Sequence, residues 1–152
     1  MTVSSGFSIS LVVMPSRFFK PHRFFGKLAV VRILAIDDEK AILDMLKRAL
    51  DLFGFCVEVA TGGEEGIEKF KNEDFDVVVT DILMPGVDGI SVLNYIRKSK
   101  RSSTPVIGIS GTPWLLQNEN FDLILDKPFS IKFLVESIKD ITGKETAALR
   151  DS

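Results

Sequence analysis

Cysteine and histidine are almost absent from this sequence of 152 residues, which contains one of each. A single cysteine excludes a disulfide framework and a cysteine-rich metal site. Cys56 stands in the apolar, strand-like run CVEVA, so we expect a buried small hydrophobe and not a nucleophile. The histidine, His22, lies outside the segment that is patterned like a folded domain, which leaves Ser-His-Asp and Cys-His catalysis without a base. Any chemistry must therefore use carboxylates, lysine and hydroxyls.

The sequence also lacks a strong charge imbalance and a long apolar run. Its net charge is -2, so we expect no direct nucleic-acid partner. The apolar run over residues 9–14 is too short to cross a bilayer, and its flanks do not form a signal peptide. We therefore expect a cytoplasmic protein without a membrane span, and the chain length favours a single well-buried core.

Residues 1–29 differ in composition from the rest of the chain, because they contain no acidic residue. Their basic residues are Arg17, Lys20, Arg23 and Lys27. A targeting segment, a basic interaction arm and translation from upstream of the true start all fit this composition. We favour a disordered or artefactual extension, since a start at Met14, Val30 or Val31 would begin the domain cleanly. An amphipathic membrane anchor is the alternative.

Apolar runs typical of strands alternate with helical patterns over residues 30–143. The strand-like runs are VVRILAI, CVEVA, FDVVVTD, TPVIGIS and LILD. The apolar positions at helical spacing are Ile42, Met45, Leu46, Ala49 and Phe53, then Ile67 and Phe70, then Ile90, Leu93 and Ile96, and finally Ile131, Leu134, Ile138 and Ile141. Near-continuous apolar strands are expected where helices cover both faces of a sheet, so the pattern predicts a parallel α/β sandwich. Residues 144–152 form a short polar tail.

Three local signals mark where the predicted helices begin or end. Gly54 should end the first of them. Thr61 and Glu64 have the spacing of a capping box at the start of the second. Asp88 can cap the third.

Polar side chains follow four of the predicted strands. Asp37 and Asp38 end the first strand, Asp81 the third, Ser110 the fourth and Lys127 the fifth. Taken singly, each is explained by a cap, a turn or a solvated surface. The carboxyl ends of parallel strands meet at one edge of the sheet, however, and ligands bind there in this architecture.

Three carboxylates that meet at one point repel each other unless a hard divalent cation joins them. Oxygen ligands favour Mg²⁺ or a similar ion. A metal-bridged carboxylate beside a lysine and a hydroxyl is suited to phosphoryl transfer, in which positioning and charge neutralisation do most of the catalysis. The substrate would be the carboxylate itself.

The motifs IDDE, TDILMPGVDG, VIGIS and DKPF resemble, in order and spacing, those of response-regulator receiver domains. The resemblance covers residues 30 to about 141. It implies a flavodoxin-like fold, with a doubly wound five-stranded parallel sheet in the order 2-1-3-4-5 and helices on both faces. Pro85 and Gly89 fit the turn that follows the acceptor strand in this family.

The resemblance also implies a role for each site residue. Asp81 is similar to the phosphoacceptor, and Asp37 and Asp38 to the acid pair that holds Mg²⁺ together with the main-chain carbonyl of Leu83. Ser110 resembles the switch hydroxyl that closes onto the phosphoryl group. Lys127 resembles the lysine that pairs with a phosphoryl oxygen, and the proline after it indicates a cis peptide bond.

The sequence departs from the family pattern between residues 111 and 126. This segment is shorter than usual, and only WLLQNE could form a helix, so we expect a shortened fourth helix. Ile124 stands where the family has an aromatic switch residue, which puts the usual serine and aromatic coupling in doubt. Trp114 is expected to be an exposed or half-buried packing residue.

These observations favour a stand-alone receiver that takes a phosphoryl group from a sensor histidine kinase or a histidine phosphotransfer protein. It would be a self-catalysed phosphoacceptor and not a turnover enzyme, and it would signal to an unknown downstream protein by conformational change. No effector domain is expected, because only TGKETAALRDS follows Ile141.

Two alternatives compete with a phosphorylated receiver. One is a receiver-like binding module that signals without phosphate. The other is a nucleotide-binding or phosphatase enzyme, for which the support is poor: TGGEEG is neither a dinucleotide fingerprint nor a P-loop, and Leu83 occupies the place of the second aspartate of haloacid-type phosphatases.

Overall fold

A computed structural model describes residues 30–116, 119–144 and 146 of the chain. The elements are β1 (Arg32–Ile36), α3 (Lys40–Leu52), β2 (Cys56–Ala60), α4 (Gly63–Asn72), β3 (Val77–Asp81), α5 (Gly89–Lys98), β4 (Val106–Ser110), the 3₁₀-helix η3 (Pro113–Leu116), β5 (Leu123–Asp126) and α6 (Ile131–Thr142). Residues 1–29, on which the predicted extension falls, lie outside the described residues.

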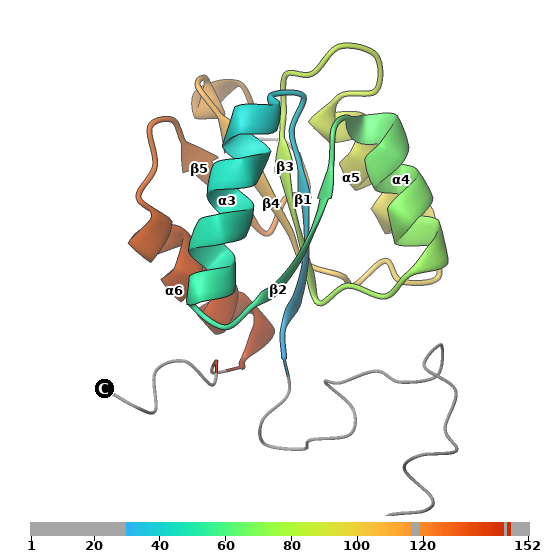
Figure 1. The fold of residues 1–152 in the computed structure, drawn as a ribbon. Helices are drawn as coiled ribbons and strands as arrows, with labels where there is room; N and C mark the ends of the chain where they lie inside the picture. Colours follow the sequence, from blue (N-terminus) through green and yellow to red (C-terminus); the bar gives the residue numbers. More distant parts are fainter. Residues whose placement is uncertain (1–29, 117–118, 145, 147–152) are drawn as a thin grey trace, which may run out of the picture.

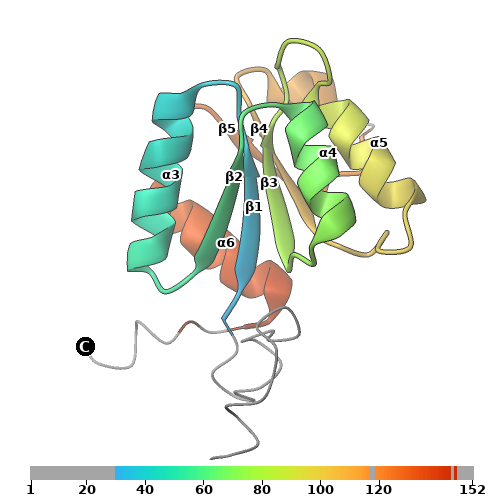
Figure 2. The same ribbon diagram turned by 45° about the vertical axis from the view of Figure 1, so that its right-hand side comes forward.

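The strands form one five-stranded sheet in the order β2-β1-β3-β4-β5, and every neighbouring pair is parallel. Helices α3 and α6 cover one face of the sheet, and α4 and α5 cover the other (Figures 1 and 2). The predicted flavodoxin-like α/β fold is thereby confirmed. No helix in the described part of the chain is long and apolar enough to cross a membrane.

Alternate residues of each inner strand enter two separate apolar cores. In β1, Ile33 and Ala35 join the core beneath α3 and α6, whereas Leu34 and Ile36 join the core beneath α4 and α5. All four side chains are almost completely buried. This two-sided burial is the reason why the strands read as continuous apolar runs.

Helix α3 faces the core with a stripe shifted from the predicted one. Its buried residues are Leu43, Leu46 and Leu50, whereas Met45 is 41% exposed. The helix turns Leu43 and Leu50 inward, because they lie one helical turn on either side of Leu46. Gly54 ends the helix as predicted, with φ at 86° and its N–H donating to Asp51 O at 3.0 Å.

The capping box predicted from Thr61 and Glu64 is wrong in its acidic partner. Glu65 Oε2 accepts from both the main-chain N–H and the hydroxyl of Thr61, each at 2.8 Å. Helix α4 begins at Gly63, so the residue that reaches back to Thr61 lies one position later than the motif requires. Asp88 caps α5 as predicted, accepting from the Ser91 N–H at 2.8 Å.

Cys56 is exposed at the start of β2, which corrects the prediction that it is buried. Strand β2 lies at an edge of the sheet, and Cys56 is its first residue. An apolar run therefore identified the strand correctly but not the exposure of its end.

The shortened fourth helix is the 3₁₀-helix η3, and Phe121 packs on the sheet beyond it. Gly108 makes room for this ring: a Cβ placed there would lie 3.1 Å from Phe121 and 2.9 Å from Ile82 Cδ1. Arg97 of α5 holds the segment, donating to Asn120 O and to the carboxylate of Asp122. The Phe121 side chain and the ion pair between Arg97 and Asp122 thus take part of the place of a full fourth helix over this part of the sheet.

Candidate functional site

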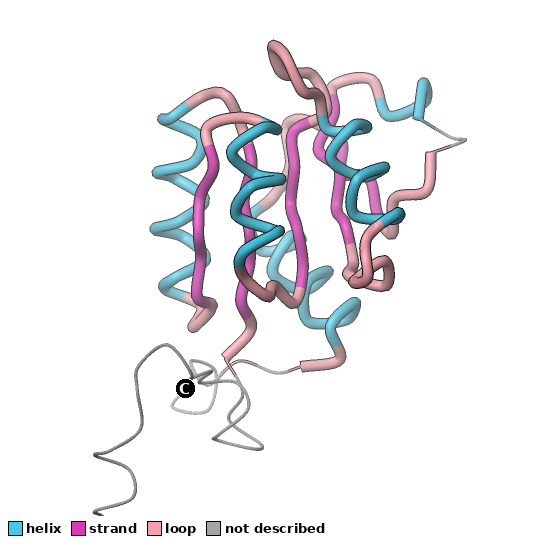
Figure 3. The backbone as a smooth tube through the Cα atoms, turned by 90° about the vertical axis from the view of Figure 1, so that its right-hand side faces the viewer, coloured by secondary structure: helices cyan, strands magenta, loops and turns pink. Residues whose placement is uncertain are grey.

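The parallel strands end at one edge of the sheet (Figure 3), and the predicted site residues stand at these ends or directly after them. Asp37 and Asp38 follow β1, while Asp81 and Ser110 are the last residues of β3 and β4. Lys127 follows β5, and its main-chain N–H donates to Ser110 O at 3.0 Å. The topology therefore places these residues together from four separate parts of the sequence.

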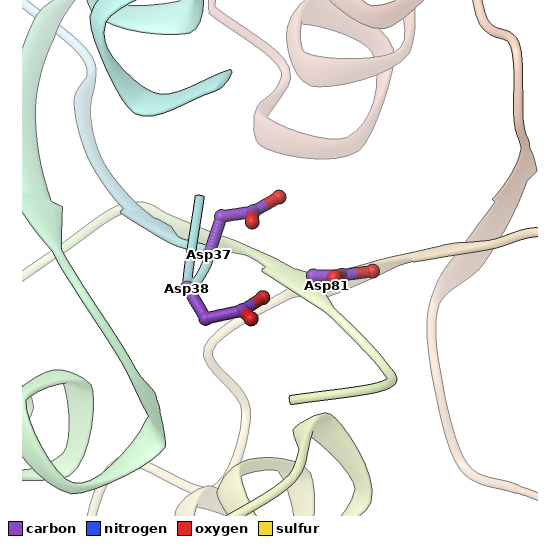
Figure 4. A group of neighbouring side chains, drawn as sticks. All are labelled: Asp37, Asp38 and Asp81. Carbon is purple, nitrogen blue, oxygen red and sulfur yellow. The ribbon is translucent and has the colours of Figure 1, made fainter. Parts of the chain in front are cut away.

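Three carboxylates converge at this edge. Asp37, Asp38 and Asp81 each offer an oxygen, and these oxygens lie within 4.8 Å of one another (Figure 4). Asp37 and Asp81 are 2% and 5% exposed, whereas Asp38 is open to solvent. The structure thus provides two sheltered carboxylates with a third at the rim, from which a ligand can enter.

Lys127 supplies a positive charge to the acidic group. Its Nζ lies 3.0 Å from Asp81 Oδ1, and the same oxygen accepts from the Ile82 main-chain N–H at 3.0 Å. Partial burial of the ammonium opposes its charge, but the hydrogen bond and charge of Asp81 outweigh that effect, so the pKa of Lys127 lies above its usual value. Two donors thus fix the direction of the Asp81 carboxylate.

The position of Asp37 in the site changes the pKa of its carboxyl group. Burial raises its pKa to about 6 from 3.8, and the charges of Asp81 and Asp38 act in the same direction. The Glu39 N–H donates to Asp37 Oδ1 at 2.8 Å and opposes this shift only in part. Asp37 is therefore partly protonated near pH 6 when no cation compensates its neighbours.

Ser110 is buried, and its hydroxyl oxygen is engaged by its own loop. Ser110 Oγ accepts from the Thr112 N–H at 3.0 Å, and Thr112 Oγ1 lies 3.5 Å away. Sequence reasoning did not assign this contact to Thr112. Leu83, two residues after Asp81, has a side chain that is 73% exposed, and the metal-binding role of its carbonyl stays a prediction.

Main-chain groups complete the site in ways that a side-chain pattern cannot reveal. The N–H groups of Glu39 and Ile82 each donate to a site carboxylate. The Asp37 N–H donates to Ala60 O at 3.2 Å, so the end of β2 helps to hold the acid pair. The peptide bond between Lys127 and Pro128 is cis, as the motif predicted.

The donor set fits a hard divalent cation. All three ligands are carboxylate oxygens, which suit Mg²⁺ or Ca²⁺ better than the softer metals that prefer thiolate or imidazole. One lysine offsets only part of three negative charges, and repulsion from Asp81 and Asp38 adds to the effect of burial in raising the pKa of Asp37. A bound cation would remove that repulsion, with Asp37, Asp38 and Asp81 as its ligands.

Comparison with known proteins decides the family. The sequence profile of the response regulator receiver domain matches residues 33–139. The chain belongs to the response-regulator receiver family. Receiver domains of this family belong to two-component regulatory systems, and the convergence of the three acidic residues at the strand ends agrees with this membership.

The receiver domain is similar to regulators and to solved receiver structures. Transcriptional regulatory protein TrcR of Mycobacterium tuberculosis is 34% identical over 130 residues, which cover 82% of this chain and 49% of TrcR. The chain spans about half the length of the curated relatives it matches.

Two receiver structures match most of this chain. The CheY-like receiver of Methanospirillum hungatei matches with a TM-score of 0.69 and 32% identity, covering 75% of this chain and 94% of its own. TrrA of Thermotoga maritima, solved in complex with Mg²⁺ and BeF, matches with a TM-score of 0.67 and 32% identity, covering 74% and 99%.

Proposed function

We propose that this chain receives a phosphoryl group on Asp81 from a sensor histidine kinase or a histidine phosphotransfer protein. The observation that carries the proposal is the position of Asp81, which lies within 4.8 Å of two further carboxylates and 3.0 Å from the Lys127 ammonium. Such an arrangement suits phosphoryl transfer, because positive charge beside the acceptor carboxylate offsets the negative charge of the phosphoryl group as it moves from donor to acceptor.

The chemistry would be a direct displacement at phosphorus. A carboxylate oxygen of Asp81 forms a bond to phosphorus as the bond to the donor histidine nitrogen breaks, and the imidazole leaves with the electron pair and takes up a proton. Lys127 then pairs with an oxygen of the phosphoryl group, whose negative charge develops next to its ammonium. The Ile82 N–H keeps the carboxylate aimed during the attack.

Asp37 and Asp38 would hold Mg²⁺ together with Asp81, and the Leu83 carbonyl is the predicted main-chain ligand. When bound, the ion supplies positive charge that offsets the phosphoryl oxygens and the clustered carboxylates. TrrA, which shares this fold, binds Mg²⁺ with a beryllofluoride group, and that precedent supports the assignment.

Ser110 is the residue through which phosphorylation of Asp81 would change the protein surface beyond β4. Its hydroxyl now accepts from the Thr112 N–H, and a phosphoryl group on Asp81 would offer that hydroxyl three strong acceptors. Moving Ser110 would pull on the loop that leads into η3. The output would then pass to a downstream protein through the β4–β5 side, and the site would act in the cytoplasm as a signalling module without turnover.

A mass measurement tests the proposal against a phosphate-independent binding module. The protein is incubated with Mg²⁺ and acetyl phosphate, and intact mass spectrometry follows the addition of one phosphoryl group. Wild type should gain that mass, Asp81→Asn should not, and excess chelator should abolish labelling. Asp88→Asn, which changes a helix cap and not the site, is the matched control and should label normally. A wild-type chain that never gains mass would favour the binding module.

A further inference from the structure

Strand β2 leaves one row of main-chain groups facing away from the sheet, because β1 is its neighbour on one side and the sheet ends on the other. The Cys56 N–H donates to Val31 O, and Ala60 O accepts from the Asp37 N–H, so residues 56 and 60 face β1. The facing direction alternates along a parallel strand, so the N–H and C=O groups of Val57 and Val59 point outward.

Two lysines occupy the outward carbonyls. Lys47 of α3 donates to Val57 O at 2.9 Å, and Lys69 of α4 donates to Val59 O at 2.6 Å. Helices α3 and α4 flank β2 on opposite faces of the sheet (Figure 1), so one ammonium reaches the edge from each face. Both acceptors on this edge are therefore already satisfied by charged donors.

Acidic neighbours hold both ammonium groups in place. Lys47 Nζ lies 3.1 Å from Asp51 Oδ2. Lys69 Nζ lies 3.4 Å from Glu65 Oε1 and 3.9 Å from Glu58 Oε2. These pairs are partly exposed and add little stability, but they keep two long side chains directed at the strand edge.

We propose that Lys47 and Lys69 close the β2 edge to strand addition by a second copy of this chain. An exposed edge with the β-favouring residues of CVEVA would template pairing, and lysine is one of the devices that block such pairing. A second copy is the matching partner because two β2 edges can pair about a twofold axis, where each supplies the groups that the other needs.

With the lysines present, the carbonyls of Val57 and Val59 that a second copy would need are already hydrogen-bonded. Pairing of two β2 edges would also place the two ammonium groups of one copy next to the two of the other. The closed edge would prevent association through β2 whether or not Asp81 is phosphorylated.

The test removes the two donors while keeping the length of the side chains. Lys47→Met/Lys69→Met is compared with wild type and with Lys98→Met/Lys132→Met, which makes the same charge change on exposed positions of α5 and α6. Multi-angle light scattering after size exclusion gives the mass in solution, and hydrogen exchange reports the amides of Val57 and Val59. Circular dichroism melting checks that each variant is folded.

We expect the β2 double variant to dimerise at least roughly tenfold more tightly than wild type, with new protection of the Val57 and Val59 amides. The charge-matched control should behave as wild type. Lys47→Arg/Lys69→Arg should have the same mass in solution as wild type, because arginine restores a charged donor. A folded Lys47→Met/Lys69→Met variant that associates no more than wild type, or one that associates without protecting these amides, would overturn the proposal.

Discussion

Lys127 and Asp81 form an ion pair of 3.0 Å, in which the aspartate is almost buried and the lysine is partly open to solvent. The pair joins the end of β3 to the residue after β5, across the intervening strand β4. Because Asp81 also lies beside Asp37 and Asp38, the Lys127 ammonium is the positive charge that partly neutralises the three carboxylates of the described site.

Replacing Lys127 by alanine should impair the reaction more than the fold. Loss of one charged donor to the phosphoryl oxygens should slow acyl-phosphate formation by roughly a hundredfold. Rates of mass gain with acetyl phosphate and Mg²⁺ give the measurement, and Lys132→Ala on exposed α6 is the control. An unchanged rate for Lys127→Ala would remove Lys127 from the site chemistry.

Asp37 should make the metal-free protein less stable as pH rises. Its pKa is about 6 in the fold against 3.8 for an ordinary aspartate, so the folded state binds more protons than the unfolded state between these values. The contribution of Asp37 to stability is therefore lost as pH increases from about 4 to about 6, by up to about 3 kcal/mol, and this contribution does not change above that range.

Urea unfolding across this pH range measures the effect of Asp37. Asp37→Asn should flatten the profile and be more stable than wild type at pH 7 without metal. Saturating Mg²⁺ should also reduce the decline, because the cation binds the ionised carboxylates. The other carboxylates are common to both proteins, so a stability advantage of Asp37→Asn over wild type that does not grow between pH 4 and pH 6 would contradict the assignment.

The sequence predicted the framework of the site better than its details. Asp37, Asp81 and Lys127 could be found because each stands one or two residues after an apolar run, and parallel topology brings such ends together. The main-chain donors of Glu39 and Ile82 could not be found, since every residue carries an N–H and only the folded backbone directs it.

Other errors have the same origin. The cap on Thr61 moved from Glu64 to Glu65 because the starting residue of a helix is set by tertiary packing as well as by the motif. Cys56 was misjudged because apolar patterning identifies a strand without saying that it lies at a sheet edge.

Gly108 should be intolerant of a side chain, because Phe121 and Ile82 occupy the space above it. Gly108→Val should reduce the free energy of unfolding by about 1–3 kcal/mol through overpacking. Gly62→Ala is the matched control, since a Cβ there meets no atom within 4 Å. Equal stability of the two variants in urea would show that the Phe121 segment is not packed as described.

Residues 1–29 should be dispensable for folding and for phosphorylation. A chain that begins at Val30 retains β1 and all of the residues that form the acidic group. It should unfold with the same cooperativity as the full chain and gain the phosphoryl mass at the same rate. Loss of cooperative unfolding after truncation would show that the extension is structural.

The lifetime of the phosphoryl group on Asp81 depends on how water reaches phosphorus, and we expect Leu83 and Thr112, which lie two residues after Asp81 and Ser110, to flank that path. Leu83 is apolar and 73% exposed, and the Thr112 hydroxyl lies 3.5 Å from Ser110 Oγ, where it can interact locally. Neither is an acid or an amide that would align a water for attack, so we expect slow hydrolysis and a persistent signal.

The short segment after Ser110 has the opposite effect on the rate of hydrolysis if it leaves the site open to water. Decay of the labelled protein, followed by mass spectrometry for wild type, Leu83→Asn and Thr112→Glu, separates the two effects. Slow decay that either substitution accelerates supports control by these side chains. Fast decay that neither substitution changes would mean that exposure of the loop sets the lifetime.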